Sequence, residues 1–565
     1  MAGFRDILGL NFSWDASAAL LREGRVLAAA AEERFDRVKH SGAFPHRAID
    51  YCLGEAGTDL DGLDAVAFFW NPAHEMPGPD TASSRWRDHR EYLWNVPQNL
   101  MGRVRDTRFD ATEQVFHRDG APPLRFFYVT HHRAHAASAF YPSPFKRAAV
   151  YVADGYGERA SSTFAAGEGA RLSFLAETRF PHSLGAFYAA FTEYLGFKPN
   201  AGEGKLMGLA PYGYAELYKP IREMLALLPD GGLELELSMF DFHRPGAPAR
   251  YSPKLTALLG PPRAPEAPID DRHKAIAASV QTVLEEALIH QTRALRGRTR
   301  LSNLCLAGGV ALNCAAMGRI LRESGFKRIF VQPAAGDSGA ALGAALYVHH
   351  QLGGAEARER QRTDFHGPSY GADEVREAIA RAGYAYTRPN DVARETARLL
   401  AEGKFLGWFQ GRMEYGPRAL GARSILADPR NAGARGRLNA EVKRREDFRP
   451  FAPAVLEERW RDFFDGPEAS PFMSWTCRAR STDLPAVTHV DGSARVQTVS
   501  AERHPLFHRM IAAFGGMTSV PAVLNTSFNG RGEPIVRTPE DALRTFAATG
   551  LDALAIGPYL VEKPR

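Results

Sequence analysis

The order of strands and helices in the first two thirds of this 565-residue chain limits its fold more than any other feature. Three short apolar runs are followed by a helical pattern, a further strand and a second helix, and the same order then returns. The first copy comprises strands at 7–12, 16–21, 25–31, 65–69 and 124–129, with helices at 46–55 and from His135 onward. The second copy comprises strands at 147–153, 162–166, 172–177, 301–306 and 328–331, with helices at 184–194, at 274–296, after Gly309 and at 338–347.

Two consecutive βββαβα halves indicate an α/β protein. They are typical of the actin-like (ASKHA) superfamily, which includes actin, hexokinase and Hsp70 and binds a nucleotide between its halves. We therefore predict a duplicated, actin-like N-terminal domain over residues 1–355.

The chain changes character after a polar, glycine-containing stretch at 351–371, which is the best linker candidate. Amphipathic helices and apolar strands follow, and the run 538–541 (Thr-Pro-Glu-Asp) has the cap, the proline and the carboxylates of a helix start. These features predict a separate α/β domain over residues 356–565. Its expected helices are 373–382 and 391–401, and its expected strands are 405–410, 452–456, 521–528 and 553–561.

Composition and charge exclude several classes of protein. The net charge of +5 is small for this length, and the most basic short run, 443–445, is followed at once by Glu446 and Asp447, so nucleic acid is not an expected partner. Four cysteines without CxxC spacing argue against a disulfide framework and against a structural zinc site. The chain has no signal-like apolar core and no apolar stretch of membrane length. We therefore expect a cytoplasmic protein with no membrane partner.

Two histidines four residues apart suggest a metal site. His131 and His135 follow the apolar run 124–129, and on a helix this spacing places both imidazoles on one face. By itself, such a pair is more often a partly solvated surface feature. Asp154 and Asp337, however, each follow a β-rich run beside glycines. Two histidines and two aspartates form a mixed nitrogen and oxygen ligand set, which suits Fe(II), Mn or Zn better than Mg or Ca.

Two glycine-containing segments of the N-terminal domain are candidate nucleotide contacts. Gly308 and Gly309 follow a strand and open a helix at Asn313, a position where backbone can approach a phosphate closely. Lys205 lies in the glycine loop 202–208, and the alternative there is a helix entry with an exposed lysine. No GxxxxGK[ST] segment occurs, which excludes a P-loop NTPase.

The C-terminal domain concentrates arginine beside glycine and proline. The segment 411–424 carries three arginines, among them Arg418, and later segments add further cations. Guanidinium forks and backbone amides are the groups that a polyphosphate needs, so one interpretation is a shared anion pocket. The other interpretation is a solvated basic surface. The later cations are Lys443, Arg449, Arg495 and Arg531.

Taken together, the motifs resemble those of the NodU/CmcH O-carbamoyltransferases, natural-product enzymes that carbamoylate nodulation factors, cephalosporins, aminoglycosides and ansamycins. The resemblance covers nearly the whole chain. The matching segments are 8–11, 15–20, 32–35 with Lys39 and His40, the pair His131 and His135, 154–155, 205–210, 308–313, 416–421, 449–453 and 525–529.

The resemblance implies chemistry in two steps. A YrdC-like C-terminal domain makes carbamoyl adenylate from carbamoyl phosphate and ATP, with Mg²⁺ accompanying the ATP. An N-terminal domain similar to the tRNA threonylcarbamoyl transferase then passes the carbamoyl group to a hydroxyl of a small molecule, and AMP leaves. Fe(II) or another divalent transition metal positions the intermediate and polarises its carbonyl. A homodimer is a further expectation.

The same resemblance assigns residues to these steps. The implied carbamoyl phosphate contacts are Arg418, Lys443 and Arg449, and the implied ATP contacts are Arg495 and Arg531. The cofactor-binding set is completed by Lys205, Gly308, Gly309, Asn313 and Ser527. The implied catalytic set is Asp15, Lys39, His131 and Asp154, and the implied metal ligands are His131, His135, Asp154 and Asp337.

One position departs from the family pattern. The family normally has His immediately before the Asp of the turn at 12–15, whereas this chain has Trp14. An indole cannot accept a proton, so Asp15 becomes the nearest candidate base, and Trp14 could form an apolar wall for a bulky acceptor. The alternative is that Trp14 only packs and Asp15 only fixes the turn.

Two other functions compete with a small-molecule carbamoyltransferase. A tRNA-modifying fusion enzyme of the threonylcarbamoyl type would combine the same two domain types. It should carry a continuous basic surface, which the dilute charge does not suggest. A sugar kinase of the actin-like superfamily would leave the C-terminal arginines unexplained.

Overall fold

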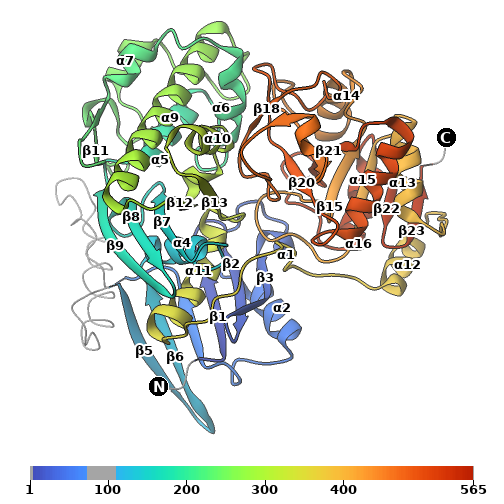
Figure 1. Ribbon diagram of the computed structural model, residues 1–565, viewed down its shortest axis with the longest axis horizontal. Coiled ribbons are helices and arrows are strands. Elements are labelled where there is room, and N and C mark those ends of the chain that lie inside the picture. The colour runs from blue at the N-terminus through green and yellow to red at the C-terminus, as the bar shows by residue number, and fades with distance from the viewer. Residues whose placement is uncertain (1–3, 73–109, 564–565) are drawn as a thin grey trace. The chain divides into compact units, whose positions relative to one another are not determined.

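The computed structural model describes residues 4–72 and 110–563 (Figure 1). Contacts between residues divide the chain into two compact units. The first comprises residues 1–29 and 42–361, and the second comprises residues 30–41 and 362–565. A short segment from the beginning of the chain therefore belongs to the C-terminal unit.

The first unit opens with a six-stranded sheet in the order β3-β2-β1-β4-β6-β5. Its strands are β1 (Asp6–Asn11), β2 (Ser17–Arg22), β3 (Arg25–Ala31), β4 (Ala65–Phe68), β5 (Ala111–Arg118) and β6 (Ala121–Val129). Strand β1 is antiparallel to β2 and parallel to β4, and β4 is parallel to β6. Helix α2 (His46–Ala56) precedes β4, and α4 (His131–Phe140) follows β6. Strand β5 was not predicted, because this edge strand is largely polar and exposed and has no apolar face to detect.

The second sheet repeats this arrangement in the order β13-β12-β7-β8-β9. Its strands are β7 (Arg147–Ala153), β8 (Ala160–Glu168), β9 (Arg171–Arg179), β12 (Asn303–Ala307) and β13 (Arg328–Val331). Strand β12 is parallel to both β7 and β13, whereas β7 and β8 are antiparallel. The helices of this half are α5 (Leu184–Tyr194), α9 (Asp271–Thr299), α10 (Cys314–Glu323) and α11 (Asp337–Tyr347). The repeated strand order confirms the predicted duplicated actin-like fold.

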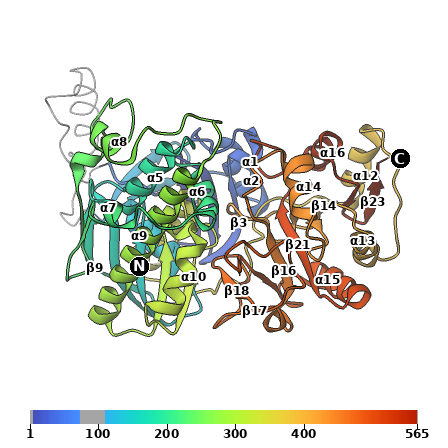
Figure 2. The same cartoon turned by 90° about the horizontal axis from the view of Figure 1, so that it is seen from above.

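Smaller elements between β9 and β12 surround the long helix α9. Helices α5, α6, α7 and α10 all pack against α9 (Figure 2). The remaining elements of this unit are α6 (Glu203–Leu209), η1 (Ala210–Tyr212), α7 (Tyr218–Arg222), β10 (Leu225–Leu227), β11 (Leu233–Leu235), η2 (Leu237–Met239), α8 (Pro253–Leu259), η3 (Gly309–Leu312) and η4 (Val348–Leu352).

Helices α4 and α11 approach each other so closely that their contact depends on glycine. A Cβ built on Gly343 of α11 would lie 1.9 Å from the carbonyl oxygen of Ala134 in α4. A Cβ on Gly9 of β1 would lie 2.0 Å from the carbonyl oxygen of Ala341. Glycine and alanine therefore let α11 lie against both α4 and the first sheet, which brings together the N-terminal turns of two helices that are far apart in sequence.

The second unit is built on a seven-stranded mixed sheet in the order β20-β16-β21-β15-β14-β22-β23. A buried cluster that includes Trp408, Leu426, Phe507 and Phe514 forms its core. The strands are β14 (Leu406–Phe409), β15 (Arg423–Ala427), β16 (Ala452–Leu456), β20 (Gln497–Val499), β21 (Ala522–Ser527), β22 (Ala553–Ile556) and β23 (Tyr559–Glu562), with β17 (Phe464–Asp465), β18 (Cys477–Ala479) and β19 (Ser493–Ala494) in a small separate sheet. The helices are α1 (Glu33–Asp36), α12 (Ala372–Arg381), α13 (Val392–Ala401), α14 (Ala434–Arg437), η5 (Leu438–Lys443), η6 (Trp460–Asp462), α15 (Pro505–Thr518) and α16 (Pro539–Ala548).

The predicted start of α16 is confirmed, whereas two other sequence predictions were wrong. Thr538 accepts the backbone N–H of Asp541, and the Asp541 carboxylate accepts the N–H of Thr538 in return. The stretch 553–561 is a hairpin rather than one strand, because Gly557 adopts a φ of +54° and reverses the chain. The helix expected from His135 already begins at His131.

The early segment 30–41 is joined to the second unit by arginine contacts to backbone carbonyls. Arg34 donates to the carbonyl oxygen of Gly416 at 2.7 Å. Arg37 donates to the carbonyl oxygens of Pro534 and Ile535 at 2.9 and 2.6 Å. The C-terminal unit is thus completed by residues that lie more than 300 positions earlier in the chain.

Within the described ranges, none of the helices combines the length and the apolar character that crossing a membrane requires.

Candidate active site

Four side chains of the first unit converge at the ends of two helices and one strand. His131 and His135 lie on the first turns of α4, Asp154 directly follows β7, and Asp337 is the first residue of α11. The Nε2 atoms of the two histidines are 3.1 Å apart. They lie 3.3 and 3.0 Å from Asp154 Oδ2, and 3.7 and 3.6 Å from Asp337 Oδ1. The structure thus brings together all four residues that the sequence predicted as metal ligands.

The geometry of this cluster fits one metal ion. Bonds of about 2.0–2.2 Å to nitrogen and oxygen place neighbouring ligand atoms of one ion about 3–3.6 Å apart, close to the separations seen here. One ligand atom from each of the four residues lies within 4.8 Å of all the others. Both histidines are buried and both carboxylates are partly exposed, so an ion held here can also be reached from outside. The ligand chemistry suits a divalent transition metal.

The histidines and aspartates of the cluster shift one another's pKa values. Burial lowers the pKa of His135, but the hydrogen bonds and charges of Asp154 and Asp337 outweigh it and raise that pKa to about 9. Burial acts to raise the pKa of Asp154, whereas hydrogen bonds from His131 and His135 hold it well below its usual range. A metal ion at His135 Nε2 takes the place of a proton, because only the deprotonated imidazole nitrogen can coordinate.

Two glycines after β12 leave room for Asp154. Gly308 has a φ of +91°, and a Cβ at this position would lie 2.2 Å from the carbonyl oxygen of Ala153. A Cβ on Gly309 would lie 3.0 Å from Asp154 Oδ1. Gly308 and Gly309, predicted as nucleotide contacts, therefore also have a structural role, because any side chain at Gly308 would displace the end of β7.

The turn with the predicted acceptor-side residues is tied to a metal ligand through Asn11. This asparagine is fully buried at the end of β1. Its Nδ2 donates to the carbonyl oxygens of Trp14 at 3.1 Å, Asp15 at 3.0 Å and Asp337 at 3.0 Å. Asp15 has a φ of +56°, and the Trp14 ring is partly exposed with Lys198 Nζ 5.9 Å from its centroid. Sequence reasoning did not single out Asn11, because no local pattern reports a contact across 326 positions.

The second unit gathers cations near the end of β21. Lys443 is buried, and its Nζ donates to Ser527 Oγ at 3.2 Å and to Asn529 Oδ1 at 2.7 Å. Burial lowers the pKa of Lys443 well below its usual value, and the nearby charges of Arg445, Arg449 and Lys39 act in the same direction. Burial also lowers the pKa of Arg449, to which the charge of Arg495 contributes. We call Lys39, Lys443, Arg445, Arg449 and Arg495 the cation cluster; among its members only Arg445 was not predicted as a site residue.

Both units match one protein family. Residues 6–346 match the family model described as Carbamoyltransferase N-terminus, and residues 397–563 match the model described as Carbamoyltransferase C-terminus. The chain belongs to the carbamoyltransferase family. The NodU/CmcH resemblance predicted from the motifs is thereby confirmed.

Relatives with related sequences cover most of the chain. An uncharacterized protein of Synechocystis sp. is 40% identical over 99% of this chain and 96% of its own length. Nodulation protein NolNO of Sinorhizobium fredii is 40% identical over 98% of this chain and 79% of its own. The 3'-hydroxymethylcephem-O-carbamoyltransferase of Amycolatopsis lactamdurans is 31% identical over 77% of this chain and 80% of its own. Among solved structures, full-length HypF in its phosphate- and nucleotide-bound form overlaps with a TM-score of 0.33 at 13% identity, over 62% of this chain and 47% of that one.

Four further predicted site residues are on other elements of the chain. The Asn313 side chain caps α10 through the N–H of Ala316 and exchanges hydrogen bonds with Gln281, so it already has a structural role. Lys205 lies half-buried on α6 with its Nζ 5.5 Å from the centroid of Phe197. Arg418 is half-buried in the loop between β14 and β15, and Arg531 is exposed in the loop after β21. Cofactor binding by these four residues stays a prediction.

Two of the three arginines in the segment 411–424 have structural roles. Arg423 is fully buried in β15, with its guanidinium 3.7 Å from the centroid of Phe409 and a hydrogen bond to the carbonyl of Gln410. Arg412 donates to the carbonyl oxygens of His366 and Gly367. Sequence alone could not separate these two from Arg418, since all three stand on the same glycine-rich stretch.

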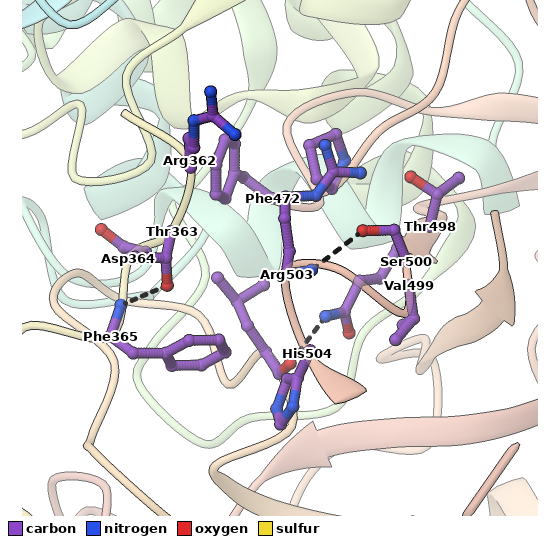
Figure 3. A pocket seen from close by; sticks show the side chains of 13 residues that line it. Arg362, Thr363, Asp364, Phe365, Phe472, Thr498, Val499, Ser500, Arg503 and His504 are labelled. Carbon is purple, nitrogen blue, oxygen red and sulfur yellow. Dashed lines mark hydrogen bonds between the residues drawn. The ribbon is translucent and has the colours of Figure 1, made fainter. Parts of the chain in front are cut away.

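The second unit contains a small, partly open pocket. It lies beside β20, where the rings of Phe365 and His504 meet edge to face (Figure 3). Its volume of about 30 Å³ holds roughly one or two water molecules. The lining residues are Arg362, Thr363, Asp364, Phe365, Leu420, Pro471, Phe472, Gln497, Thr498, Val499, Ser500, Arg503 and His504, and none of them was predicted to bind a cofactor.

Proposed function

We propose that this member of the family is an ATP-dependent O-carbamoyltransferase that makes carbamoyl adenylate and transfers its carbamoyl group to a hydroxyl of a small molecule. The observation that carries the proposal is the convergence of His131, His135, Asp154 and Asp337 on a site with metal-ligand geometry. The cation cluster in the other unit supports it, because a reaction with two anionic substrates needs such charges.

The first half-reaction, in which carbamoyl phosphate and ATP give carbamoyl adenylate, is assigned to the second unit. Lys443, Arg449 and Arg418 are proposed to hold carbamoyl phosphate, and Arg495 and Arg531 the ATP. Ser527, whose hydroxyl accepts a hydrogen bond from Lys443, is a further proposed cofactor contact. A buried lysine among arginines is costly when charged, and an incoming phosphate group would offset that cost. Lys39 contributes a further cation from the early segment.

The second half-reaction is assigned to the first unit. His131, His135, Asp154 and Asp337 would hold a divalent transition metal such as Fe(II), which when bound polarises the carbonyl of the carbamoyl donor. Asn11 keeps the turn of Trp14 and Asp15 beside the backbone of Asp337, so an acceptor hydroxyl bound at that turn would lie near the metal ligands. Asp15 is the proposed acceptor of the hydroxyl proton, and AMP is the proposed leaving group.

The acceptor is proposed to be a hydroxyl of a natural product, as in antibiotic biosynthesis. Two relatives support this class through their names, one a nodulation protein and the other a 3'-hydroxymethylcephem O-carbamoyltransferase. Trp14 replaces the histidine of the family pattern and offers a flat apolar surface, which favours an acceptor larger than a simple alcohol.

Product analysis tests the proposal. The protein is incubated with ATP, carbamoyl phosphate and a panel of hydroxyl compounds, and mass spectrometry follows nucleotides and acceptors. We expect AMP together with a carbamoyl mass increment on one acceptor. Formation of ADP without a carbamoylated product would favour a sugar kinase. A threonylcarbamoyl-type mass increment on tRNA added to the assay, with tRNA binding that weakens steeply as salt rises, would favour the tRNA-modifying alternative.

A further inference from the structure

A buried carboxylate outside the ligand set reaches the start of the helix that carries both histidines. Glu158 lies in the loop between β7 and β8, four residues after Asp154, and is 6% exposed. Its Oε1 accepts the backbone N–H of His131 at 3.0 Å and that of Asn71 at 2.7 Å. Its Oε2 lies 3.1 Å from the same His131 nitrogen.

Glu158 caps the N-terminus of α4 in place of the residue that precedes the helix. The first N–H groups of a helix have no partner within the helix, and a side chain at the residue before it usually accepts one of them. Thr130 occupies that position here but makes no capping bond, because its hydroxyl donates to the carbonyl oxygen of Asp110. A carboxylate at the positive end of the helix is also favoured electrostatically.

The imidazole rings themselves have few polar anchors. The buried Nδ1 atoms of His131 and His135 find no hydrogen-bond partner among residues 4–72 and 110–563. Metal-binding histidines usually gain their orientation from such a bond. In this protein the position of His131 therefore depends on the backbone of the first turn of α4 and on the rings packed around it.

The same carboxylate also holds the residues that pack on His131. The rings of Phe69 and Trp70 meet the His131 ring edge to face, with centroids 5.1 and 5.6 Å away. Asn71, whose N–H is bound by Glu158, directly follows Trp70. The loop itself lies tight against α4, because a Cβ on Gly157 would come within 3.0 Å of the Cβ of His131.

We infer that Glu158 is a positioning residue for the metal site, which fixes His131 by holding the first turn of α4 and the chain after Trp70 with one carboxylate. The inference rests on the metal site of the proposed function and adds a residue outside its ligand set. Glu158 touches neither the reacting groups nor the ion, so its effect appears in how tightly and in what geometry the ion is held.

Titration of the full-length protein with Co²⁺ alone tests this role, because the visible absorption of Co²⁺ reports its coordination geometry. In Glu158→Ala we expect the dissociation constant for Co²⁺ to rise about 10- to 100-fold, together with a changed visible band. Glu193→Ala is the matched control, since Glu193 of α5 also accepts a backbone N–H, that of Arg250, but does so away from the metal ligands. The control should bind Co²⁺ as the unmodified protein does.

The outcomes separate this inference from the proposed function. If the unmodified protein binds no Co²⁺, the metal site itself fails. If it binds Co²⁺ and Glu158→Ala binds equally well with an unchanged band, the positioning role is wrong, even when the variant melts at a lower temperature. If Glu158→Ala does not fold, Glu158→Gln decides the question by the same two readouts. The glutamine amide places an N–H donor opposite the N–H of His131. We therefore expect the dissociation constant for Co²⁺ to rise about 10-fold in this variant.

Discussion

At the scale of single residues, each metal ligand owes its position to a strand end or a helix start. Asp154 directly follows β7 and Asp337 opens α11 after β13, and the two strands run parallel through β12. Parallel strands end at the same edge of a sheet, which is why ligand sites of α/β proteins gather there. His131 and His135 reach the same point from the first turns of α4.

The two half-reactions should respond to different residues. His131→Ala is expected to leave carbamoyl adenylate formation intact and to abolish transfer, because it removes a ligand only from the first unit. Arg449→Ala should abolish adenylate formation through loss of a half-buried cation, a change of roughly 2–5 kcal/mol in substrate binding. Mass spectrometry of carbamoyl adenylate and of carbamoylated acceptor measures each step separately.

A surface arginine provides the control for this pair. Arg376→Ala removes an exposed cation on α12 and should affect neither step. If His131→Ala protein carbamoylates its acceptor at the normal rate with metal excluded, the assignment of the two half-reactions to different residues is refuted.

Trp14 and Asp15 should control the acceptor side alone. Asp15→Asn is expected to keep adenylate formation and to lose transfer, because an amide cannot take the hydroxyl proton. Trp14→His should lower transfer strongly if the indole shapes the acceptor pocket, which is the outcome we expect. Both variants are assayed for each half-reaction with the same acceptor. Near-normal transfer by Asp15→Asn would exclude Asp15 as an essential base, and a gain by Trp14→His would mean that tryptophan is a defect at this position.

Binding of phosphate to the cation cluster should be coupled to proton uptake. The pKa of Lys443 in the folded protein lies well below 10.5, so the free site loses its lysine proton at a lower pH than an unfolded chain does. A bound anion favours the charged lysine. Affinity for inorganic phosphate should therefore fall as pH rises through the window between the lowered pKa and 10.5.

Calorimetry in buffers of different ionisation enthalpy measures this uptake. Lys443→Met should remove it, and a proton uptake that persists in Lys443→Met would assign the effect to another group.

The lowered pKa of Lys443 also affects the stability of the fold. Because the unfolded state binds more protons in this window, the contribution of Lys443 to the free energy of unfolding should increase as pH rises through it.

At the scale of elements, the contact of α4 with α11 determines whether the metal ligands meet. The contact is possible because Gly343 and Ala134 bring two helix backbones together, which lets Asp337 reach His131 and His135. Small residues spaced along both helices are visible in the sequence, but they do not say which helix will be the partner.

Substitution of this glycine should therefore damage the site from a distance. Gly343→Ala places a methyl group 1.9 Å from the Ala134 carbonyl oxygen, so we expect a loss of about 1–3 kcal/mol in the free energy of unfolding and weaker Co²⁺ binding. Gly297→Ala is the matched control, since Gly297 lies in α9 with nothing within 4 Å of an added Cβ. The control substitution should raise the free energy of unfolding by about 0.5–1 kcal/mol. Chemical denaturation and Co²⁺ titration provide the two measurements, and equal behaviour of both variants would contradict the close-packing argument.

Sequence patterns located most elements because apolar periodicity is a local property of the chain. They failed where the position of a residue depends on contacts with residues far away in the sequence. The strands 25–31, 147–153 and 328–331 were predicted with the observed limits. The hairpin at 553–561 was missed although Gly557 and Pro558 form a turn signal, because the apolar run continues on both sides of them. Asn11 and Glu158 act through hydrogen bonds to distant backbone, for which the sequence carries no periodic signal.

At the scale of the whole molecule, the chain leaves the first unit after residue 29 and returns to it at residue 42. The C-terminal unit therefore cannot be obtained by one cut in the linker. The match to the Carbamoyltransferase C-terminus model covers 397–563 and omits the early segment altogether. That segment nevertheless supplies Lys39 to the cation cluster and the Arg34 and Arg37 contacts described above.

A fragment of residues 362–565 should accordingly be incomplete. We expect it to unfold at a lower temperature than the same unit in the full chain and to form no carbamoyl adenylate, because it lacks Lys39 and leaves the backbone acceptors of Gly416, Pro534 and Ile535 without their arginines. Fusing residues 30–41 ahead of residue 362 through a flexible linker should restore part of both properties. Fusing the same segment with Arg37→Ala should restore less, since a hydrogen bond to a charged group contributes about 1.5–3 kcal/mol. Thermal unfolding followed by circular dichroism and an assay for carbamoyl adenylate distinguish the three proteins. Full stability and activity of residues 362–565 alone would show that the early segment is dispensable, and would leave Lys39 without a part in the reaction.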